Sequence, residues 1–391
     1  MTSDDRSNSY KLATRLGHAG RDPARYEGAV NPAVTRATTL IIEDADDLYN
    51  TPKKTYALQG MGVQEALCDA LVAVEGGAGA TLAPSGLAAC TLALMGVVRA
   101  GGEVLVSDSI YGPTRRFCDR VLKRMGIATR YFDPRIGAGV AELMHENTCA
   151  VFMESPGSLT FEIQDVPAIT AEARRRGVTT IIDNTWSAGV YFKPFDHGVD
   201  YSVQALTKYQ SGHADAFVGA VLASDDKLHT TMTQTYRDLG LGVAPDDAYL
   251  ALRGMRTMLV RLERQGQASL RVARWLEQHP AVARMLHPAL PSHPDHALFA
   301  RDFTGTGGLF GVILKPCAPE VLKRMLESLS LFSMGFSWGG YESLIVPCDP
   351  QIIRTAKPWA AEGPLLRLSI GLEDPDDLIA DLETGLAGLS A

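Results

Sequence analysis

The sequence lacks the features that mark several classes of protein. Basic residues are in the minority, because 37 Lys and Arg stand against 45 Asp and Glu, which gives a net charge of −8. Nucleic-acid binding needs clustered Lys and Arg, so no nucleic-acid partner is expected. The most apolar stretch, "GLAACTLALMGVV", is shorter than the roughly 20 residues of a membrane-spanning helix. The polar start "MTSDDRSNSYK" contains no signal-peptide region. We therefore predict a soluble cytoplasmic protein with no membrane partner.

Cysteine is also scarce. The six cysteines are scattered along the chain and form no C-x-x-C pair. They are typical of small buried apolar residues in a reducing compartment. The composition is otherwise that of an ordinary globular protein, with 46% hydrophobic and 21% charged residues. A chain of 391 residues is too long for one compact core and suggests two or three domains.

Three segments of the chain differ in pattern. Residues 1–60 are polar and rich in Gly, Pro and Thr, which indicates an arm. Residues 61–255 alternate helical runs such as "MGVQEALCDALVAVEG" with strand-like runs such as "EVLVSD" and "TTIID". This alternation predicts an α/β domain whose mainly parallel sheet is covered on both faces. Residues 256–391 begin with a long charged helix and continue with strands such as "GLFGVILK", which predicts a smaller C-terminal α/β domain.

The last helix has clear end signals. Asp374 is a typical N-cap residue, and Pro375 suits the first helical position. The apolar residues expected on one face of this helix are Leu378, Ile379, Leu382 and Leu386.

Several candidate functional residues follow strand-like runs, where open α/β sheets collect their sites. Ser85 and Gly86 begin an apolar helix whose free N–H groups suit a phosphate, although taken alone they are more simply explained by tight packing. Asp183 follows the run "TTII", and taken alone it is more simply a turn or cap residue. Tyr111 could lie over a flat ligand, although a core tyrosine is the commoner outcome.

Lys208 is the most informative of these residues. It lies in "QALTKYQSGHAD", just after an apolar strand-like run. Burial disfavours the charged amine, so its pKa falls and it becomes a nucleophile, unless the head group reaches solvent. Pyridoxal phosphate needs an amine for its aldehyde, a carboxylate for its pyridine nitrogen and an anion site for its phosphate. Lys208, Asp183 and the helix start at Gly86 supply this combination.

The sequence resembles the Cys/Met-metabolism family of pyridoxal-phosphate enzymes over nearly its whole length, and within it bacterial cystathionine β-lyases. The segments that carry the resemblance are "GHAGRDP", "ESPGSLTFEIQDVPAI", "IIDNTWSAGV", "QALTKY", "GHADA", "HPAVARMLHPALP", "LFSMGFSWGGYESL" and "RLSIGLEDPDDLIADL". The resemblance implies a fold-type I, aminotransferase-like architecture and a homotetramer of two dimers that share active sites. It also implies β-elimination on a cysteine-type amino acid, which yields a thiol, pyruvate and ammonia.

The resemblance further implies roles for individual residues. Lys208 matches the lysine that carries the cofactor and removes the α-proton, and Asp183 matches the acid paired with the pyridine nitrogen. Tyr111 matches the residue stacked on the ring. Arg367 matches the arginine that binds the substrate α-carboxylate, where a surface ion pair is the alternative. The other matched positions are the phosphate contacts Gly86, Leu87 and Thr207, the substrate-pocket residues Ser337 and Trp338, and Tyr56, which the neighbouring subunit contributes.

One segment departs from the family. Cystathionine β-lyases carry Tyr-x-Arg-Arg where this chain reads "YALQG", so Leu58 and Gln59 replace two arginines. In the family the first arginine reaches the cofactor phosphate across the dimer, and the pair is expected to face the far carboxylate of cystathionine. We therefore predict a pocket for a neutral or cationic far end, such as that of an S-alkyl cysteine or canavanine. The alternative is that Lys53, Lys54 or an arginine from elsewhere has taken over.

Other functions remain open on the sequence alone. A γ-lyase acting on canavanine or methionine would use the same cofactor residues. A metal site could be drawn from "LHPALPSHPDH", but its prolines indicate an exposed loop and its spacing is not that of a metal site. The residues of that segment that could bind a metal are His287, His293, Asp295 and His296. A non-catalytic scaffold would not require Lys208 and Asp183 together.

Overall fold

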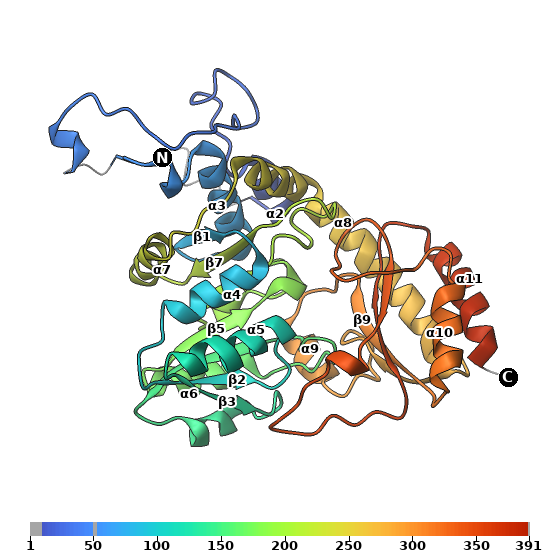
Figure 1. Ribbon diagram of the computed structural model, residues 1–391. Coiled ribbons are helices and arrows are strands. Elements are labelled where there is room, and N and C mark those ends of the chain that lie inside the picture. The colour runs from blue at the N-terminus through green and yellow to red at the C-terminus, as the bar shows by residue number, and fades with distance from the viewer. Residues whose placement is uncertain (1–9, 50–52, 390–391) are drawn as a thin grey trace.

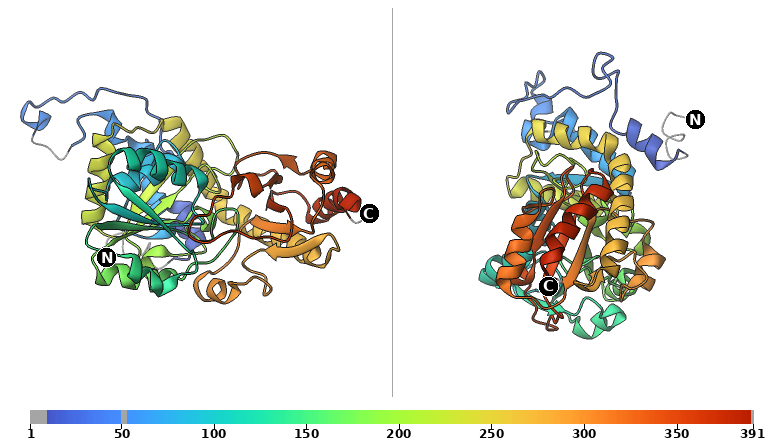
Figure 2. Two further views of the ribbon diagram at one scale, coloured as in Figure 1. Left: turned by 60° about the horizontal axis from the view of Figure 1, so that its bottom comes forward. Right: turned by 90° about the vertical axis from the view of Figure 1, so that its right-hand side faces the viewer.

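Two β-sheets organise the molecule (Figure 1). The computed structural model describes residues 10–49 and 53–389. Helix α8 (Pro245–Gln278) runs from the larger sheet to the smaller one. Between α2 (Leu12–His18) and α3 (Gly62–Glu75), the described residues 19–49 and 53–61 include an extended part that projects from the rest of the molecule in all three views (Figures 1 and 2).

The larger sheet has seven strands and is mainly parallel. In spatial order its strands are β1 (Gly79–Ala83), β7 (Gly219–Ala223), β6 (Tyr201–Gln204), β5 (Thr179–Asp183), β4 (Thr148–Glu154), β2 (Glu103–Ser107) and β3 (Ala128–Phe132). Only β7 runs against its neighbours, β1 and β6. The carboxyl ends of the other six strands therefore meet at one edge, where open α/β sheets bind ligands.

Helices cover both faces of this sheet. Strand β2 shows why: Val104 and Val106 pack on the side of α4 (Gly86–Met95) and α7 (Asp226–Asp238), whereas Leu105 packs on the side of α6 (Val166–Arg175). A strand buried on both faces reads as a continuous apolar run, as "EVLVS" does. The predicted α/β fold with a doubly covered, mainly parallel sheet is confirmed.

The smaller sheet has five strands. In spatial order they are β10 (Ser333–Met334), β11 (Leu344–Pro347), β12 (Leu365–Ser369), β9 (Leu309–Leu314) and β8 (Val282–Leu286). Helix α8, α10 (Pro319–Ser328) and α11 (Pro375–Leu386) share one apolar core with it. The predicted start of α11 is confirmed, because the Asp374 carboxylate accepts a hydrogen bond from the Asp376 N–H at 2.9 Å.

Shorter helical segments complete the description. They are α5 (Gly112–Phe117), α9 (His296–Asp302), and the short 3₁₀ or π segments Asp46–Leu48, Ala57–Gln59, Cys118–Leu122, Gly137–Leu143, Thr185–Ser187, Pro194–His197, Asp349–Gln351 and Ala387–Leu389. The turn at Cys118–Leu122 is a π-helix that continues α5. Within the described ranges, no helix has the length and apolar character needed to cross a membrane.

Two expectations from the sequence need comment. The boundary expected between residues 255 and 256 falls inside α8, so a continuous helix joins the two parts. The proline-rich segment is not an exposed loop, because His287 and His293 are buried. Its acid, Asp295, is also buried and accepts two hydrogen bonds of 2.7 Å from the Arg135 guanidinium. Among the described residues, no group of three or more possible metal ligands is found.

Candidate active site

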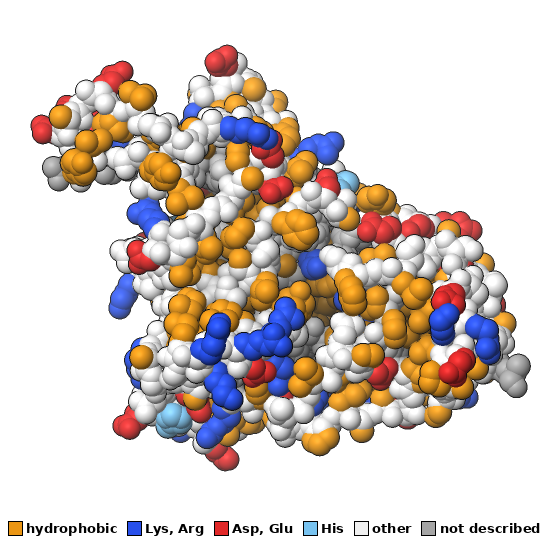
Figure 3. Space-filling view, in the orientation of Figure 1, with side chains coloured by type: hydrophobic (Ala, Val, Ile, Leu, Met, Phe, Trp, Pro, Cys, Tyr) orange, Lys and Arg blue, Asp and Glu red, His pale blue; other side chains and the backbone are white. Residues whose placement is uncertain are grey.

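A cavity of about 930 Å³ lies at the carboxyl edge of the larger sheet. Residues that follow β1, β2, β4, β5 and β6 line one side, and residues of the smaller sheet and its loops line the other. In Figure 3 the surface is hollowed near its centre, and Lys and Arg side chains gather beside the hollow, over α5. The volume is within the usual range for a small-molecule site.

Lys208 lies in this cavity, four residues after the end of β6. Its Nζ donates a hydrogen bond to the Ser337 Oγ at 2.7 Å and lies 5.3 Å from the centre of the Trp338 ring. Burial, and then the charge of the nearby Arg367, lower the pKa of the amine to about 8, although Asp183 partly opposes the shift. In the described part of the chain Lys208 has no ion pair. The amine is therefore available as a nucleophile and base near neutral pH.

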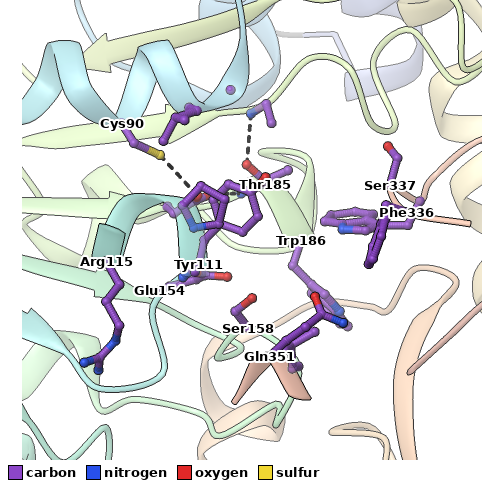
Figure 4. Close-up of a pocket in the computed structure, with 18 of the residues that line it drawn as sticks. Cys90, Tyr111, Arg115, Glu154, Ser158, Thr185, Trp186, Phe336, Ser337 and Gln351 are labelled. Carbon is purple, nitrogen blue, oxygen red and sulfur yellow. Dashed lines mark hydrogen bonds between the residues drawn. The ribbon is translucent and has the colours of Figure 1, made fainter. Parts of the chain in front are cut away.

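Asp183 is the last residue of β5 and is only 9% exposed. One carboxylate oxygen accepts a hydrogen bond from the Thr185 N–H at 3.1 Å, and the other lies 3.6 Å from the Cys90 thiol (Figure 4). Burial raises the pKa of Asp183, although the Thr185 hydrogen bonds and Lys208 counteract this effect. The first oxygen therefore stabilises the turn that follows β5 by accepting this hydrogen bond, and the carboxylate also borders the cavity.

A second buried carboxyl group lies beside the first. Glu154 ends β4 and pairs in register with Asp183 on β5. Its carboxylate accepts a hydrogen bond of 2.6 Å from the backbone N–H of Tyr111, and Tyr111 lies at the centre of the site (Figure 4). Burial, and then the charge of Asp183, raise the pKa of Glu154 well above its usual value. Two adjacent buried acids favour a cationic ligand group at this end of the cavity.

Tyr111 is not a core tyrosine. It is 41% exposed and borders the cavity just before α5. Burial of the phenol, followed by the nearby Cys90 and Asp183, raises its pKa, so the hydroxyl stays protonated.

The start of α4 borders the cavity. The side chain of Ser85 caps this helix, and the N–H groups of Gly86 and Leu87 occupy the first helical positions, which have no intrahelical acceptor. A Cβ at Gly86 would lie 2.5 Å from the Cβ of Ala205, so this approach requires glycine. Thr207 borders the same space, and its hydroxyl bonds to a backbone carbonyl at 3.2 Å. Free N–H groups at a helix start suit a phosphate.

Arg367 approaches from the smaller sheet. It lies in the middle of β12, is 8% exposed, and donates a hydrogen bond of 2.8 Å to the Ser337 carbonyl. Its Nε has no hydrogen-bond partner among the described residues, and burial lowers its pKa. Ser337 has a φ of 76°, a left-handed conformation that is strained for a residue other than glycine. This strained residue holds both Arg367 and Lys208.

These groups together fit pyridoxal phosphate. The cavity provides an amine with a lowered pKa, two buried carboxyl groups for a cationic ring nitrogen, and a helix start for a phosphate. The free donor of the buried Arg367 suits the carboxylate of an amino acid. Of the predicted residues, Gly86, Leu87, Tyr111, Asp183, Thr207, Lys208, Ser337, Trp338 and Arg367 all line the cavity.

The arm residues lie elsewhere. Tyr56, Leu58 and Gln59 are not among the described residues that line the cavity, and Tyr56 is 51% exposed. Lys54 is bonded to Glu65, and Lys53 to Asp47. Neither lysine is therefore a free replacement for the two arginines that the segment lacks.

The cavity lining contains two arginines that sequence reasoning missed. Arg116 and Arg120 of the segment "TRRFCDR" border it. These two residues favour the alternative of an arginine from elsewhere over the prediction of a pocket for a neutral or cationic far end. Their four-residue spacing, which places them on one face of a helix, is the only signal in the sequence that could have identified the pair.

Comparison with known proteins agrees with this site. Residues 13–387 match the model of the Cys/Met metabolism PLP-dependent enzyme family, and the chain belongs to this family. It is 48% identical to a protein of Rhizobium johnstonii named "Putative cystathionine beta-lyase", over 97% of each chain. It is 42% identical to the cystathionine beta-lyase MetC of Escherichia coli, over 96% of this chain and 98% of that protein.

A solved structure shows the same fold. The cystathionine gamma synthase of Xanthomonas oryzae pv. oryzae, solved in complex with aminoacrylate and cysteine, superposes with a TM-score of 0.90. It is 30% identical to this chain and covers 97% of it, and 99% of that chain is matched. The predicted family is confirmed, and the chain is an enzyme whose cofactor is pyridoxal phosphate.

Proposed function

We propose that this enzyme cleaves the carbon–sulfur bond of an S-substituted cysteine by β-elimination and releases a thiol, pyruvate and ammonia. The observation that carries the proposal is Lys208, a cavity amine whose pKa is lowered and is affected by both the buried Asp183 and the buried Arg367. The names of the relatives in Rhizobium and Escherichia support a β-lyase. The neighbouring cystathionine gamma synthase leaves γ-elimination as the alternative to test.

The roles of the residues follow from their chemistry. When bound, pyridoxal phosphate supplies an aldehyde for an amine and a ring that withdraws electrons from the substrate α-carbon. Asp183 would keep the ring nitrogen protonated, and Gly86, Leu87 and Thr207 would bind the phosphate. Arg367 would hold the α-carboxylate and so orient the Cα–H bond toward Lys208.

Proton transfer at the substrate is assigned to Lys208. Its neutral amine would take the α-proton, and its pKa of about 8 leaves a useful neutral fraction at pH 7 to 8. The hydrogen bond to Ser337 would aim the Nζ while the amine is free. Tyr111 would cover the cofactor ring and, as a protonated phenol, could donate a proton to the departing sulfur.

The decisive experiment is a substrate panel scored for the keto-acid product. Pyruvate from cysteine conjugates supports β-elimination, whereas 2-oxobutyrate from homocysteine-type substrates supports the γ-lyase alternative. Absence of both products from holoenzyme would contradict either lyase and favour a non-catalytic scaffold. Borohydride reduction followed by peptide mapping should place the phosphopyridoxyl group on Lys208.

The assembly proposed is a homotetramer of two dimers that share active sites, in the cytoplasm. Its support is the projecting arm, whose exposed Tyr56 and Leu58 lie outside the cavity of their own chain and are available to another copy. We also propose an arm of residues 1–60, a cofactor-binding domain of residues 61–255 and a small domain of residues 256–391. The two sheets support that division, with α8 continuous across the second boundary.

A further inference from the structure

Two arginines at the mouth of the cavity take no part in the chemistry above. Arg116 is in α5 and Arg120 is in the π-turn that follows it, and both are exposed residues that line the cavity. In the described part of the chain, neither guanidinium has an ion pair or a hydrogen bond. Two unpaired guanidinium groups on one cavity wall repel each other unless an anion lies between them.

The other charged side chains of this wall are already engaged. Arg115 is buried, forms an ion pair with Asp108, and lies 3.6 Å from the centre of the Tyr131 ring. Asp119, the acid of this wall, accepts a hydrogen bond of 2.7 Å from the Tyr131 hydroxyl. Asp119 keeps its negative charge and offsets one of the two free arginines, so the wall has a net positive charge, which comes from Arg116 and Arg120.

The position of this wall fits the far end of a substrate. In Figure 4, Ser337 and Arg115 lie on opposite sides of Tyr111, and Ser337 is bonded to Arg367. A substrate whose α-carboxylate lies on Arg367 can therefore extend past Tyr111 toward α5. Arg116 is close enough to Tyr111 for its charge to counteract the upward shift of the phenol pKa.

We propose that Arg116 and Arg120 form a subsite for an anionic group carried by the leaving thiol. This inference rests on the proposed β-elimination and adds the substrate class: cysteine conjugates whose sulfur substituent ends in a carboxylate, sulfonate or phosphate. A cationic substituent is disfavoured here, and a neutral one gains nothing from the pair. The enzyme should therefore prefer an anionic substituent over a neutral or cationic one. The uncharged Leu58 and Gln59 suggested the opposite preference, but here the positive charge comes from α5 and the turn that follows it.

The test compares three conjugates of similar length on holoenzyme. They are S-(2-carboxyethyl)cysteine, S-propylcysteine and S-(2-aminoethyl)cysteine, with kcat/KM measured from pyruvate release. An exposed ion pair changes such a ratio by roughly two- to fivefold, so two arginines should favour the anionic over the neutral conjugate by about tenfold at low ionic strength. The preference should shrink toward about threefold in 0.5 M salt, because exposed charges are screened.

Variants then locate the charge. Arg116→Gln combined with Arg120→Gln should bring the ratio of anionic to neutral conjugate close to one. Arg124→Gln is the matched control, because it removes the same charge from the next helical turn, and Arg124 does not line this cavity. Arg116→Glu combined with Arg120→Glu should invert the order and favour the aminoethyl conjugate, a result that loss of folding cannot produce.

Two results would overturn the inference. In the first, the wild-type enzyme does not prefer the anionic over the neutral conjugate. In the second, Arg124→Gln lowers the ratio of kcat/KM for the anionic and neutral conjugates as much as Arg116→Gln combined with Arg120→Gln does. If none of the conjugates releases pyruvate, the proposed elimination fails. The subsite is then tested by the Kd values of the same three conjugates, measured by the change in cofactor absorbance. The anionic conjugate should bind most tightly and the cationic one most weakly.

Discussion

Asp108 joins the two halves of the site, and its replacement should both destabilise the protein and loosen the cavity. It follows β2 and is fully buried. Its carboxylate accepts hydrogen bonds from the backbone N–H groups of Thr355 at 2.9 Å, Ala356 at 2.8 Å and Lys357 at 3.2 Å. It also forms an ion pair with the buried Arg115. The loop that it holds connects β11 to β12.

The expected cost can be estimated from these contacts. Asp108→Asn keeps the size of the side chain but removes the negative charge that pairs with Arg115. It also replaces one acceptor oxygen with an amide NH₂ group, which cannot accept hydrogen bonds from the backbone N–H groups of the loop. Breaking a buried ion pair from one side costs about 3 to 5 kcal/mol, so we expect a loss of about 3 kcal/mol in the free energy of unfolding. The same loop carries Gln351 and Ile353 into the cavity lining, so KM should also rise.

Denaturant unfolding and substrate kinetics check this prediction. Asp349→Asn is the control, because Asp349 lies in the same loop and accepts a single backbone hydrogen bond, from Leu365 at 3.0 Å; it should cost about 1 kcal/mol. The pair Asp108→Asn with Arg115→Met should cost less than Asp108→Asn alone, since no unpaired charge remains and the amide oxygen can still accept a hydrogen bond from the loop. A loss below 1 kcal/mol for Asp108→Asn, with KM unchanged, would refute the reasoning.

The pH dependence has a definite sign. Burial pushes the pKa of Asp108 upward, but the hydrogen bonds from the loop and from Arg115 outweigh burial and hold it below the ordinary value. A depressed pKa contributes stability above the unfolded value, about 3.9, and this contribution disappears as the pH falls through the folded value. The difference between wild type and Asp108→Asn should therefore be constant near pH 7 and shrink below about pH 4.

Three further predictions concern the cofactor residues. In enzyme freed of cofactor, labelling of the Lys208 amine should rise with pH through about 8, and a midpoint near the ordinary value of 10.5 would contradict the effect of burial. Arg367→Gln removes a like charge, so it should raise that midpoint and, by loss of a charge-assisted hydrogen bond, increase KM by about tenfold or more; an unchanged KM would exclude Arg367 from carboxylate binding. Asp183→Ala should bind the cofactor weakly and lose most turnover, and near-wild-type turnover in saturating cofactor would remove its assigned role.

The central strands of the fold could be predicted from the sequence, because a strand that is buried on both faces has a short apolar run at its centre. Strands β2 and β5 have β-branched or apolar residues at their centres and end in Ser107 and Asp183, so the type and the end of each strand were predictable. Strand β1 was not predicted. Its sequence "GATLA" lies among glycines and resembles a loop, and its pairing with β7 depends on a segment more than a hundred residues away.

The same distinction applies to the site. Lys208 and Asp183 could be predicted because each follows a strand end, and parallel strands bring their ends together. Arg116 and Arg120 could not, because two arginines on a helix surface have the pattern of a solvated face. They become cavity residues only when the loop after β11 closes the space opposite α5, and that contact depends on Asp108 and residues 355–357, which are far apart in the sequence.

The arm also bears on the charge of the substrate site, whether it comes from the same chain or from a second copy. A second copy that inserted its arm into this cavity would bring Tyr56, Leu58 and Gln59, none of which is charged. The nearby Lys54 is held by Glu65 and by the Gly60 carbonyl, so moving it toward a substrate would break contacts within its own chain. An arm inserted in this way would therefore add no charge to the cavity through Tyr56, Leu58 or Gln59. The preference for an anionic leaving group should be the same in any oligomer that forms, because Arg116 and Arg120 belong to the chain that carries Lys208.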